Sequence, residues 1–464
     1  MENKNEKQIT AANPDDVISK VASTIFLFMV IVFGIIARNY MLPMRSGDQY
    51  QFLEPWFEKI TELGPAGTLK DGIGDYMPPY FWIMIIVNAL PISNRIYGLK
   101  WVSSIADFFA AVFIMKIVKR VTGSDTKAEL SFAAAFLMPT VLMNSAGWAQ
   151  CDSIFTLFLI MCVYYLIEGK DIKAVTCFSV SFIFKLQAIF LGPLLLVMLL
   201  KGKIRLRSLI AFPVVYLAAI LPSAACGHEF SSLFTIYFDQ AGQYSMLNMT
   251  LPNIWSMVKD VNSEPLGQAG VMLAGVSCLT LIYYLYKRPQ VPGVKGTVVL
   301  AALFTLFVPY VLPYMHERYY YTAALMSLLL VFVDKRLTPV WLVVEFSSAT
   351  SHARFLLGKE EYDLRFTTFF VTAALITMFV YYCSLDGKDE EIVLAPAKPF
   401  MSLDDEEEED ETEETAEEEA AEGDEAGPAE EISEEASEKP DTSKKKNKKK
   451  PDEIEKRFGE GARI

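Results

Sequence analysis

Apolar runs recur along this chain from Val17 to Tyr382, and they constrain its fold more than any other feature. Of the 464 residues, 52% are hydrophobic and 13% are aromatic. A water-soluble domain cannot hide so many near-uniform apolar helices, because most of them would keep an apolar face in water. The sequence therefore predicts an all-α polytopic membrane protein.

Twelve segments are predicted as membrane spans. They are 18–43, 99–118, 128–146, 152–168, 173–186, 188–200, 207–226, 267–287, 297–313, 318–333, 338–352 and 364–384. Several are shorter than the roughly 20 residues that an upright spanning helix needs. Short spans with polar interruptions indicate helices that line a cavity rather than face lipid on all sides.

Clusters of lysine and arginine between the spans predict the orientation of the chain. These clusters are KIVKR (116–120), KGKIRLR (201–207), KRPQVPGVK (287–295) and DKR (334–336). Placing them in the cytoplasm puts both ends of the chain there, including the N-terminal segment 1–17. The two long loops, 44–98 and 227–266, then lie on the exocytoplasmic side, and we expect the host membrane to be the cell membrane.

The apolar segment YFWIMIIVNALP (80–91) is too short to be assigned by length alone. If it crossed the membrane, the KIVKR cluster would lie outside, against the charge rule. We therefore predict an interfacial or re-entrant helix within the first external loop. A thirteenth span is the alternative.

The net charge of −14 comes from the C-terminal tail. From Gly387 onward the chain holds 29 acids and 12 bases, so the remainder carries 30 bases against 27 acids. The tail, delimited as 385–464, has the composition of a disordered segment. We expect it to lie in the cytoplasm, outside a membrane domain that covers 18–384. The six cysteines form no CxxC pair, and they predict neither a disulfide framework nor a zinc site.

Polar and ionisable residues gather at the predicted exocytoplasmic ends of five segments. Asp48 lies at the outer end of the first span, and Asp75 and Tyr76 lie in the loop that follows. The residues at the other outer turns are Trp148, Gln150, Asp152, Lys185, Gln187, His316, Glu317 and Arg318. Ionisable groups near membrane depth are costly, so this one-sided cluster of mixed charge predicts a functional site.

Most of these residues also have a structural interpretation when taken alone. Asp48 suits a solvated loop, and Asp75 beside two prolines suits a turn. Trp148 is typical of the aromatic belt at a membrane surface. Asp152 fits the N-cap of a helix, and Lys185 could extend from a helix end toward water.

Three further ionisable residues do not join the predicted cluster. Asp107 lies inside the second span, and we expect it to pair with a neighbouring helix. His228 and His352 belong to no clear constellation, and we interpret them as loop or helix-end residues.

The chemistry of the cluster suits group transfer at a membrane surface. A carboxylate there can act as general base toward a hydroxyl group. Cationic side chains can neutralise a phosphate leaving group. Aromatic rings, with Tyr50 as a weaker candidate, can stack on sugar faces. The cluster predicts transfer from a lipid-linked phosphate to a polar acceptor outside the membrane.

The motifs that hold these residues resemble the bacterial relatives of the GPI-anchor second mannosyltransferase, which belong to the GT-C fold. The motifs are GDQY (47–50), DYMPPY (75–80), NSAGWAQCDS (144–153), FKLQAIFLGP (184–193) and MHERYYY (315–321). Each is short, and the specificity lies in their order and spacing. Met77 interrupts the family's usual DYPP pattern, and Ala149 stands where the family usually has glycine.

The resemblance implies inverting transfer of a hexose, usually mannose, from a polyprenyl-phosphate carrier, usually without a nucleotide sugar. We expect no cofactor and no metal, because no spacing demands one; a metal that bridges Asp48, Asp75 and Glu317 is the alternative. The acceptor implied is a glycan, a lipid or a protein. Asp48 matches the family's base or acceptor-positioning acid, and Asp75 matches the DYPP-like acid. Which of the two carboxylates takes the proton stays open.

Motifs for other chemistry are absent from the sequence. It contains no Walker phosphate loop, no GxGxxG before a helix, no HExxH and no GxSxG. We expect no nucleic-acid partner. A transporter or a flippase of lipid-linked glycans is the alternative, although no internal repeat supports it. A scaffold acting through its tail is a third interpretation, and deletion of 387–464 would then remove function.

Overall fold

The computed structural model describes residues 14–241, 246–258, 264–358 and 363–396. The predicted disorder of the acidic tail beyond residue 396 lies outside these described residues, as does most of the segment 1–17. The described chain up to Pro396 belongs to one compact unit.

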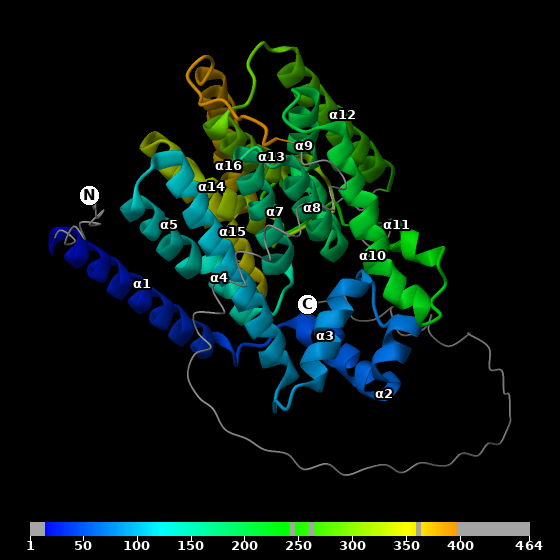
Figure 1. Cartoon of the computed structure of the whole chain (residues 1–464). Helices are drawn as coiled ribbons and strands as arrows, with labels where there is room; N and C mark the ends of the chain where they lie inside the picture. The colour runs from blue at the N-terminus through cyan, green and yellow to red at the C-terminus, as the bar shows by residue number, and fades with distance from the viewer. Residues whose placement is uncertain (1–13, 242–245, 259–263, 359–362, 397–464) are drawn as a thin grey trace, which may run out of the picture. The chain divides into compact units, whose positions relative to one another are not determined.

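Helices make up almost all of the described structure (Figure 1). In chain order they are α1 (Pro14–Met41), α2 (Glu54–Asp71), α3 (Pro78–Ala89), α4 (Arg95–Thr122), α5 (Asp125–Leu137), α6 (Pro139–Leu142), α7 (Asp152–Ile167), α8 (Asp171–Phe184), α9 (Gly192–Leu200), α10 (Ala211–Ala225), α11 (Ile236–Ala241), α12 (Glu264–Lys287), α13 (Val294–Val311), α14 (Tyr321–Val333), α15 (Thr338–Leu357) and α16 (Leu364–Ser384). In the described chain, two short strands pair in parallel, β1 (Asn248–Met249) with β2 (Met315–His316).

Six helices of the described chain are long and apolar enough to cross a membrane. They are Ile18–Met41, Arg95–Thr122, Leu206–Ala225, Glu264–Lys287, Val294–Val311 and Leu364–Ser384. The bent pair Asp125–Leu137 and Pro139–Gly147 adds a seventh if it is one span. These helices indicate an integral membrane protein. Each of the twelve segments predicted as spans contains a helix, but the count of twelve spans remains a prediction.

The exposed side chains of the outer helices are the ones that lipid accommodates. Large apolar residues stand exposed along α1, α12 and α16, whereas α13 is buried along most of its length. Contiguous exposed apolar surface of this kind is unusual in water-soluble proteins. The outer helices therefore have a lipid-facing surface, and α13 lies in the interior of the bundle.

The segment 80–91 forms most of α3, a helix of 12 residues that lies beside α2 (Figure 1). At about 1.5 Å per residue its length is well below the roughly 30 Å of a bilayer core. Its side chains Tyr80, Phe81 and Met84 are buried against aromatic residues of the same loop. The segment between α1 and α4 thus packs in a hydrophobic cluster that also includes Leu99 of α4 and Ile154 of α7.

A buried ion pair joins α1 to the rest of the bundle. The Arg38 guanidinium donates to Asp107 Oδ2 at 3.3 Å and to the Phe136 carbonyl at 3.1 Å. The Tyr321 hydroxyl donates to the other oxygen of Asp107 at 2.7 Å. Charges at membrane depth need such partners. The prediction that Asp107 pairs with a neighbouring helix is confirmed.

Residues 385–396, assigned from the sequence to the disordered tail, are packed against the body; we call them the C-terminal strap. Asp389 accepts hydrogen bonds from the backbone N–H groups of Gly293, Lys295 and Gly296 at 2.7–2.9 Å. It therefore caps the N-terminus of α13 from a distant part of the chain. The tail begins later than predicted, because this strap supplies partners that α13 lacks locally.

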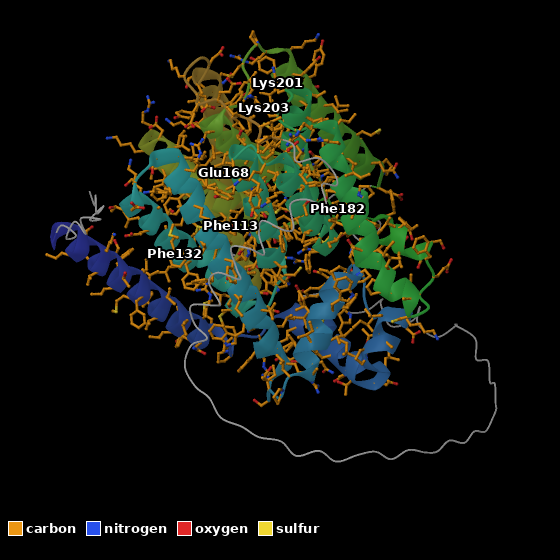
Figure 2. The ribbon with its side chains drawn as sticks, in the orientation of Figure 1. Phe113, Phe132, Glu168, Phe182, Lys201 and Lys203 are labelled. Carbon is orange, nitrogen blue, oxygen red and sulfur yellow. The ribbon has the colours of Figure 1, made fainter. Side chains whose placement is uncertain are left out.

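Ion pairs and one apolar side chain hold the rest of the C-terminal strap. Glu390 pairs with Arg120 at 2.6 Å, and Lys203 donates to Glu391 at 2.8 Å. Ile392 is buried. Lys201 and Lys203, labelled in Figure 2, lie at the end of the bundle away from α2 and α3. The strap therefore joins helix ends on the side opposite the first external loop.

We predict that a chain ending at Pro396 keeps the stability of the full chain, whereas a chain ending at Ser384 loses several kcal/mol. The cap provided by Asp389 alone is worth about 1–2 kcal/mol, so Asp389→Ala should fall between the two truncations. Thermal unfolding of the three proteins in one detergent measures the order. Equal stability of the two truncated chains would contradict the role of the strap.

Candidate active site

Asp48 is held by two hydrogen bonds that come from the segment between α6 and α7. The Trp148 indole N–H donates to Asp48 Oδ2 at 3.0 Å, and the Gln150 amide donates to the same oxygen at 2.7 Å. Both donors use Oδ2, so these bonds leave Oδ1 free to accept a proton from a ligand. The carboxylate is thus oriented by the protein and remains partly exposed.

Two π-helical turns position the partners of this contact. The turn Gln49–Leu53 follows Asp48 directly, and the turn Met143–Gly147 comes directly before Trp148. A π-helical turn accommodates one extra residue, and such turns are frequent at functional sites. Here they mark the two chain segments whose side chains meet.

Residues of α15 support Trp148 from behind. Its indole stacks on Phe355 with 4.3 Å between ring centroids, and it meets His352 edge to face at 5.7 Å. The Asn144 amide lies 3.0 Å from Asp152 Oδ2 and 3.1 Å from His352 Nε2. The sequence predicted no functional role for His352, and it predicted none for Asn144 beyond membership of the motif 144–153. A histidine inside a predicted span was the available signal.

Asp152 is buried and lies between two cations. It accepts a short hydrogen bond from Lys185, and its other oxygen is 3.9 Å from Arg318 Nε. The N-cap interpretation of Asp152 is wrong, because α7 is preceded by Cys151 and Asp152 makes no capping bond. The interpretation of Lys185 as a side chain reaching for water is also wrong, since Lys185 is buried at the end of α8.

The turn after β2 carries the remaining charges. Pairing of β1 with β2 fixes His316 beside Met249 and Thr250. The Arg318 guanidinium donates to Glu317 Oε1 at 3.1 Å and approaches Asp48 Oδ2 at 3.8 Å. Arg318 therefore links Asp48, which precedes α2, to Asp152 at the start of α7 and to Glu317 after β2.

Burial changes the acid–base properties of the loop residues. It raises the pKa of Asp75 and of Glu317, because both carboxyl groups lose water around their charged forms. The pKa of His316 falls to about 2, first through burial and then through repulsion from Arg318 and Lys185. His316 is therefore neutral at physiological pH, and the fixed cations near it are Lys185 and Arg318.

A cavity of about 320 Å³ opens beside Asp48; we call it the carboxylate cavity. It is lined by acids, aromatic rings and one arginine. The lining residues are Asp48, Gln51, Phe52, Leu53, Trp56, Asp75, Tyr76, Tyr80, Ala149, Gln150, Met249, His316, Glu317, Arg318 and Phe355. Its volume is in the range of small-molecule sites.

A second cavity of about 470 Å³ lies next to the first; we call it the cationic cavity. Lys185, Gln187 and Tyr237 line it but do not line the carboxylate cavity. Four residues line both cavities: Asp75, Tyr76, His316 and Arg318. The two cavities therefore share a wall that carries a carboxyl group and a guanidinium.

A third hollow of about 760 Å³ has an almost wholly apolar lining; we call it the apolar groove. Its residues are Phe182, Leu186, Ile189, Phe212, Pro213, Tyr216, Leu217, Phe234, Tyr237 and Phe238. Leu186, Ile189 and Tyr237 also line the cationic cavity. Phe182 is labelled in Figure 2. An apolar path on α8 and α10 thus borders the polar site.

Two buried polar atoms at the site have no hydrogen-bond partner within the described residues. They are Gln187 Oε1 and Arg318 Nε. Buried polar groups are nearly always hydrogen-bonded, so an unsatisfied pair at a cavity wall calls for an explanation.

The structure brings the predicted residues together with one exception. Tyr50 is exposed, lines none of the three hollows, and accepts a hydrogen bond from Arg45 at 2.8 Å. His228 contacts the Lys70 carbonyl away from these cavities. In the described part of the chain, no group of three His, Cys, Asp or Glu side chains is arranged to hold a metal ion.

Comparison with models of known protein families and with curated proteins finds no match to this chain. Its function must therefore be inferred from the chemistry of the site.

The backbone at Ala149 adopts a left-handed conformation, with φ at +68°. Thr250 and Tyr314 share this property; Ala149 and Tyr314 line the cavities, and Thr250 donates a hydrogen bond to Glu317 at 3.5 Å. A positive φ costs a residue with a Cβ atom about 1–2 kcal/mol. At Ala149 this conformation turns the chain sharply between Trp148 and Gln150, so that both side chains reach Asp48.

We predict that Ala149→Gly leaves stability unchanged or raises it by up to about 1 kcal/mol, because glycine removes the strain of the positive φ. Ala149→Val should lower stability by more than about 2 kcal/mol, since a β-branched residue fits neither this φ nor the buried space. Ala135→Gly is the control: Ala135 is equally buried but lies in ordinary helix. Equal losses in both glycine variants, measured by thermal unfolding, would contradict this reading.

Proposed function

We propose that this chain is an integral membrane glycosyltransferase. It moves a hexose, mannose in the first instance, from a polyprenyl-phosphate carrier to an acceptor on the exocytoplasmic side. The observation that carries this proposal is the continuity of the apolar groove, the cationic cavity and the carboxylate cavity. Their order matches the order of tail, phosphate and reacting sugar in such a donor.

The cationic cavity suits the phosphate of the donor. Lys185 and Arg318 present N–H donors there, and the buried Arg318 Nε has no hydrogen-bond partner among the described residues. Charge-assisted hydrogen bonds from fixed donors stabilise a leaving phosphate as its negative charge develops. The isoprenoid tail would lie in the apolar groove, which shares Tyr237 with this cavity.

Asp48 is the residue that suits proton removal from the acceptor. Its Oδ1 takes the proton of an acceptor hydroxyl group while the oxygen of that hydroxyl group attacks C1 of the donor sugar. The bond between C1 and the phosphate oxygen breaks on the opposite face, so the configuration at C1 inverts. The products are a new glycosidic bond and a polyprenyl phosphate, and the proton remains on Asp48 until water removes it.

Asp75 is better suited to hold the donor sugar, at the wall that the two polar cavities share, than to remove a proton. It lines both cavities, and its raised pKa favours a protonated carboxyl group that can donate a hydrogen bond. Arg318 beside it holds Glu317 and approaches Asp48. We therefore assign Asp48 as base and Asp75 as a group that positions the donor sugar.

The proposed function also requires a particular membrane topology. We propose twelve membrane spans, a GT-C fold, cytoplasmic chain ends and an exocytoplasmic site in the cell membrane. Helices such as α14, with 13 residues, are short for a bilayer. They are buried among other helices, and a buried short helix need not match the bilayer by itself.

We predict that Asp48→Asn lowers transfer from a polyprenyl-phosphate sugar by about 10²–10⁴-fold, the usual contribution of a general base. The amide keeps an oxygen that can accept from Trp148 and Gln150, so the protein should accumulate normally. Asp71→Asn, an exposed acid of the same loop, is the matched control and should retain activity. Radiolabelled donor in membranes provides the assay.

Full activity of the Asp48→Asn protein would overturn the assignment of the base. Flipping of a lipid-linked glycan in proteoliposomes without any glycosylated product would instead favour the flippase.

We predict that Leu217→Trp raises the KM for a long-chain polyprenyl-phosphate donor several-fold, because the indole fills part of the apolar groove. The KM for a donor with a two-isoprene chain should change less, since a shorter tail fills less of the groove. Leu221→Trp on the same helix is the control, as Leu221 is exposed but does not line the groove. Equal effects on both donors would contradict this placement of the tail.

A further inference from the structure

The carboxylate cavity has a charge that limits what can enter it. Asp48, Asp75 and Glu317 contribute three carboxyl groups, and Arg318 contributes the one guanidinium of its lining. His316, the remaining ionisable nitrogen group there, has its pKa lowered to about 2 and is neutral. The lining therefore holds three carboxyl groups against one guanidinium, and each carboxyl group that is ionised makes it more negative.

The guanidinium of this cavity is already engaged. Arg318 donates to Glu317 at 3.1 Å and lies 3.8 Å from Asp48, while its Nε is 3.9 Å from Asp152. A donor phosphate in the cationic cavity would also pair with Arg318 and would offset the remaining positive charge of its guanidinium. The carboxylate cavity would then become more negative at the moment when the acceptor must bind.

The remaining walls of the carboxylate cavity suit an uncharged sugar. Trp56, Tyr76 and Tyr80 form a contiguous aromatic wall, with ring centroids 5.8 Å apart for Trp56 and Tyr76 and 4.7 Å apart for Tyr76 and Tyr80. Phe52 is exposed at the edge of this wall. Aromatic faces offer apolar contact to the C–H faces of a sugar ring, and carboxylates accept hydrogen bonds from its hydroxyl groups.

We infer that the acceptor which enters the carboxylate cavity is a sugar residue without negative charge, and that a phosphate or carboxylate on this residue excludes it. This inference rests on the proposed function for calling the ligand an acceptor. The charge selection itself rests on the cavity. Placing like charges together at a binding site costs several kcal/mol, which corresponds to at least a tenfold difference in affinity.

Binding of two matched probes tests the selection without any donor. The probes are propyl mannoside and its 6-phosphate, titrated by calorimetry into the full-length protein in a non-glycosidic detergent. We expect the uncharged probe to bind at least tenfold more tightly. Glu317→Gln removes one of the three acids and should reduce this ratio several-fold. Glu58→Gln removes an exposed acid of α2 outside the cavity and should leave the ratio unchanged.

Equal or tighter binding of the phosphorylated probe overturns the inference, and so does an absence of binding by both probes. A ratio that is the same in the Glu317→Gln and Glu58→Gln proteins also overturns it, because the selection would then arise elsewhere. A second arm supplies polyprenyl-phosphate mannose and measures transfer. Selective binding without transfer refutes the proposed function alone, whereas equal transfer to both probes refutes the selection alone.

Discussion

Asp152 begins α7 in a buried position, and its carboxylate joins Lys185, Arg318 and Asn144. A buried charge is tolerated only when its partners are in place, and removal of one partner of such a pair costs about 3–5 kcal/mol. The ends of α7 and α8, the turn after β2 and the segment before Trp148 must therefore meet at one point. The cavities on either side of Arg318 follow from that requirement.

The same constraint explains how the site is divided. Arg318 is the cation common to both polar cavities, with Lys185 on the side of one and the carboxyl groups of Asp48 and Glu317 on the side of the other. Asp48 is oriented through Trp148 and Gln150, and Trp148 depends in turn on Phe355 and His352 of α15. In the proposed mechanism, proton removal and charge stabilisation would therefore take place on opposite sides of one guanidinium. This separation is what an inverting transfer between two substrates needs.

Strain and helix irregularity are concentrated at this point of the fold. Ala149, Tyr314 and the π-helical turn Gln49–Leu53 line the cavities, while Thr250 contacts Glu317 and the π-helical turn Met143–Gly147 leads directly into Trp148. Unfavourable backbone conformations persist where surrounding contacts hold them, and they are commonest at functional sites. The helical bundle, with its buried α13 and the C-terminal strap across its far end, supplies that support.

The sequence by itself determined the membrane character, a helix within each apolar run, and the candidate residues other than Tyr50, because apolar periodicity and misplaced charges are local signals. It could not determine which charges pair. Asp152 was open to a capping role until the fold placed Lys185 and Arg318 against it, and His352 had no role until α15 packed behind Trp148. The packing of residues 385–396 against the bundle likewise depended on α13 finding its cap in Asp389. Only the tertiary structure decided these points, since each pairs groups that lie far apart in the sequence.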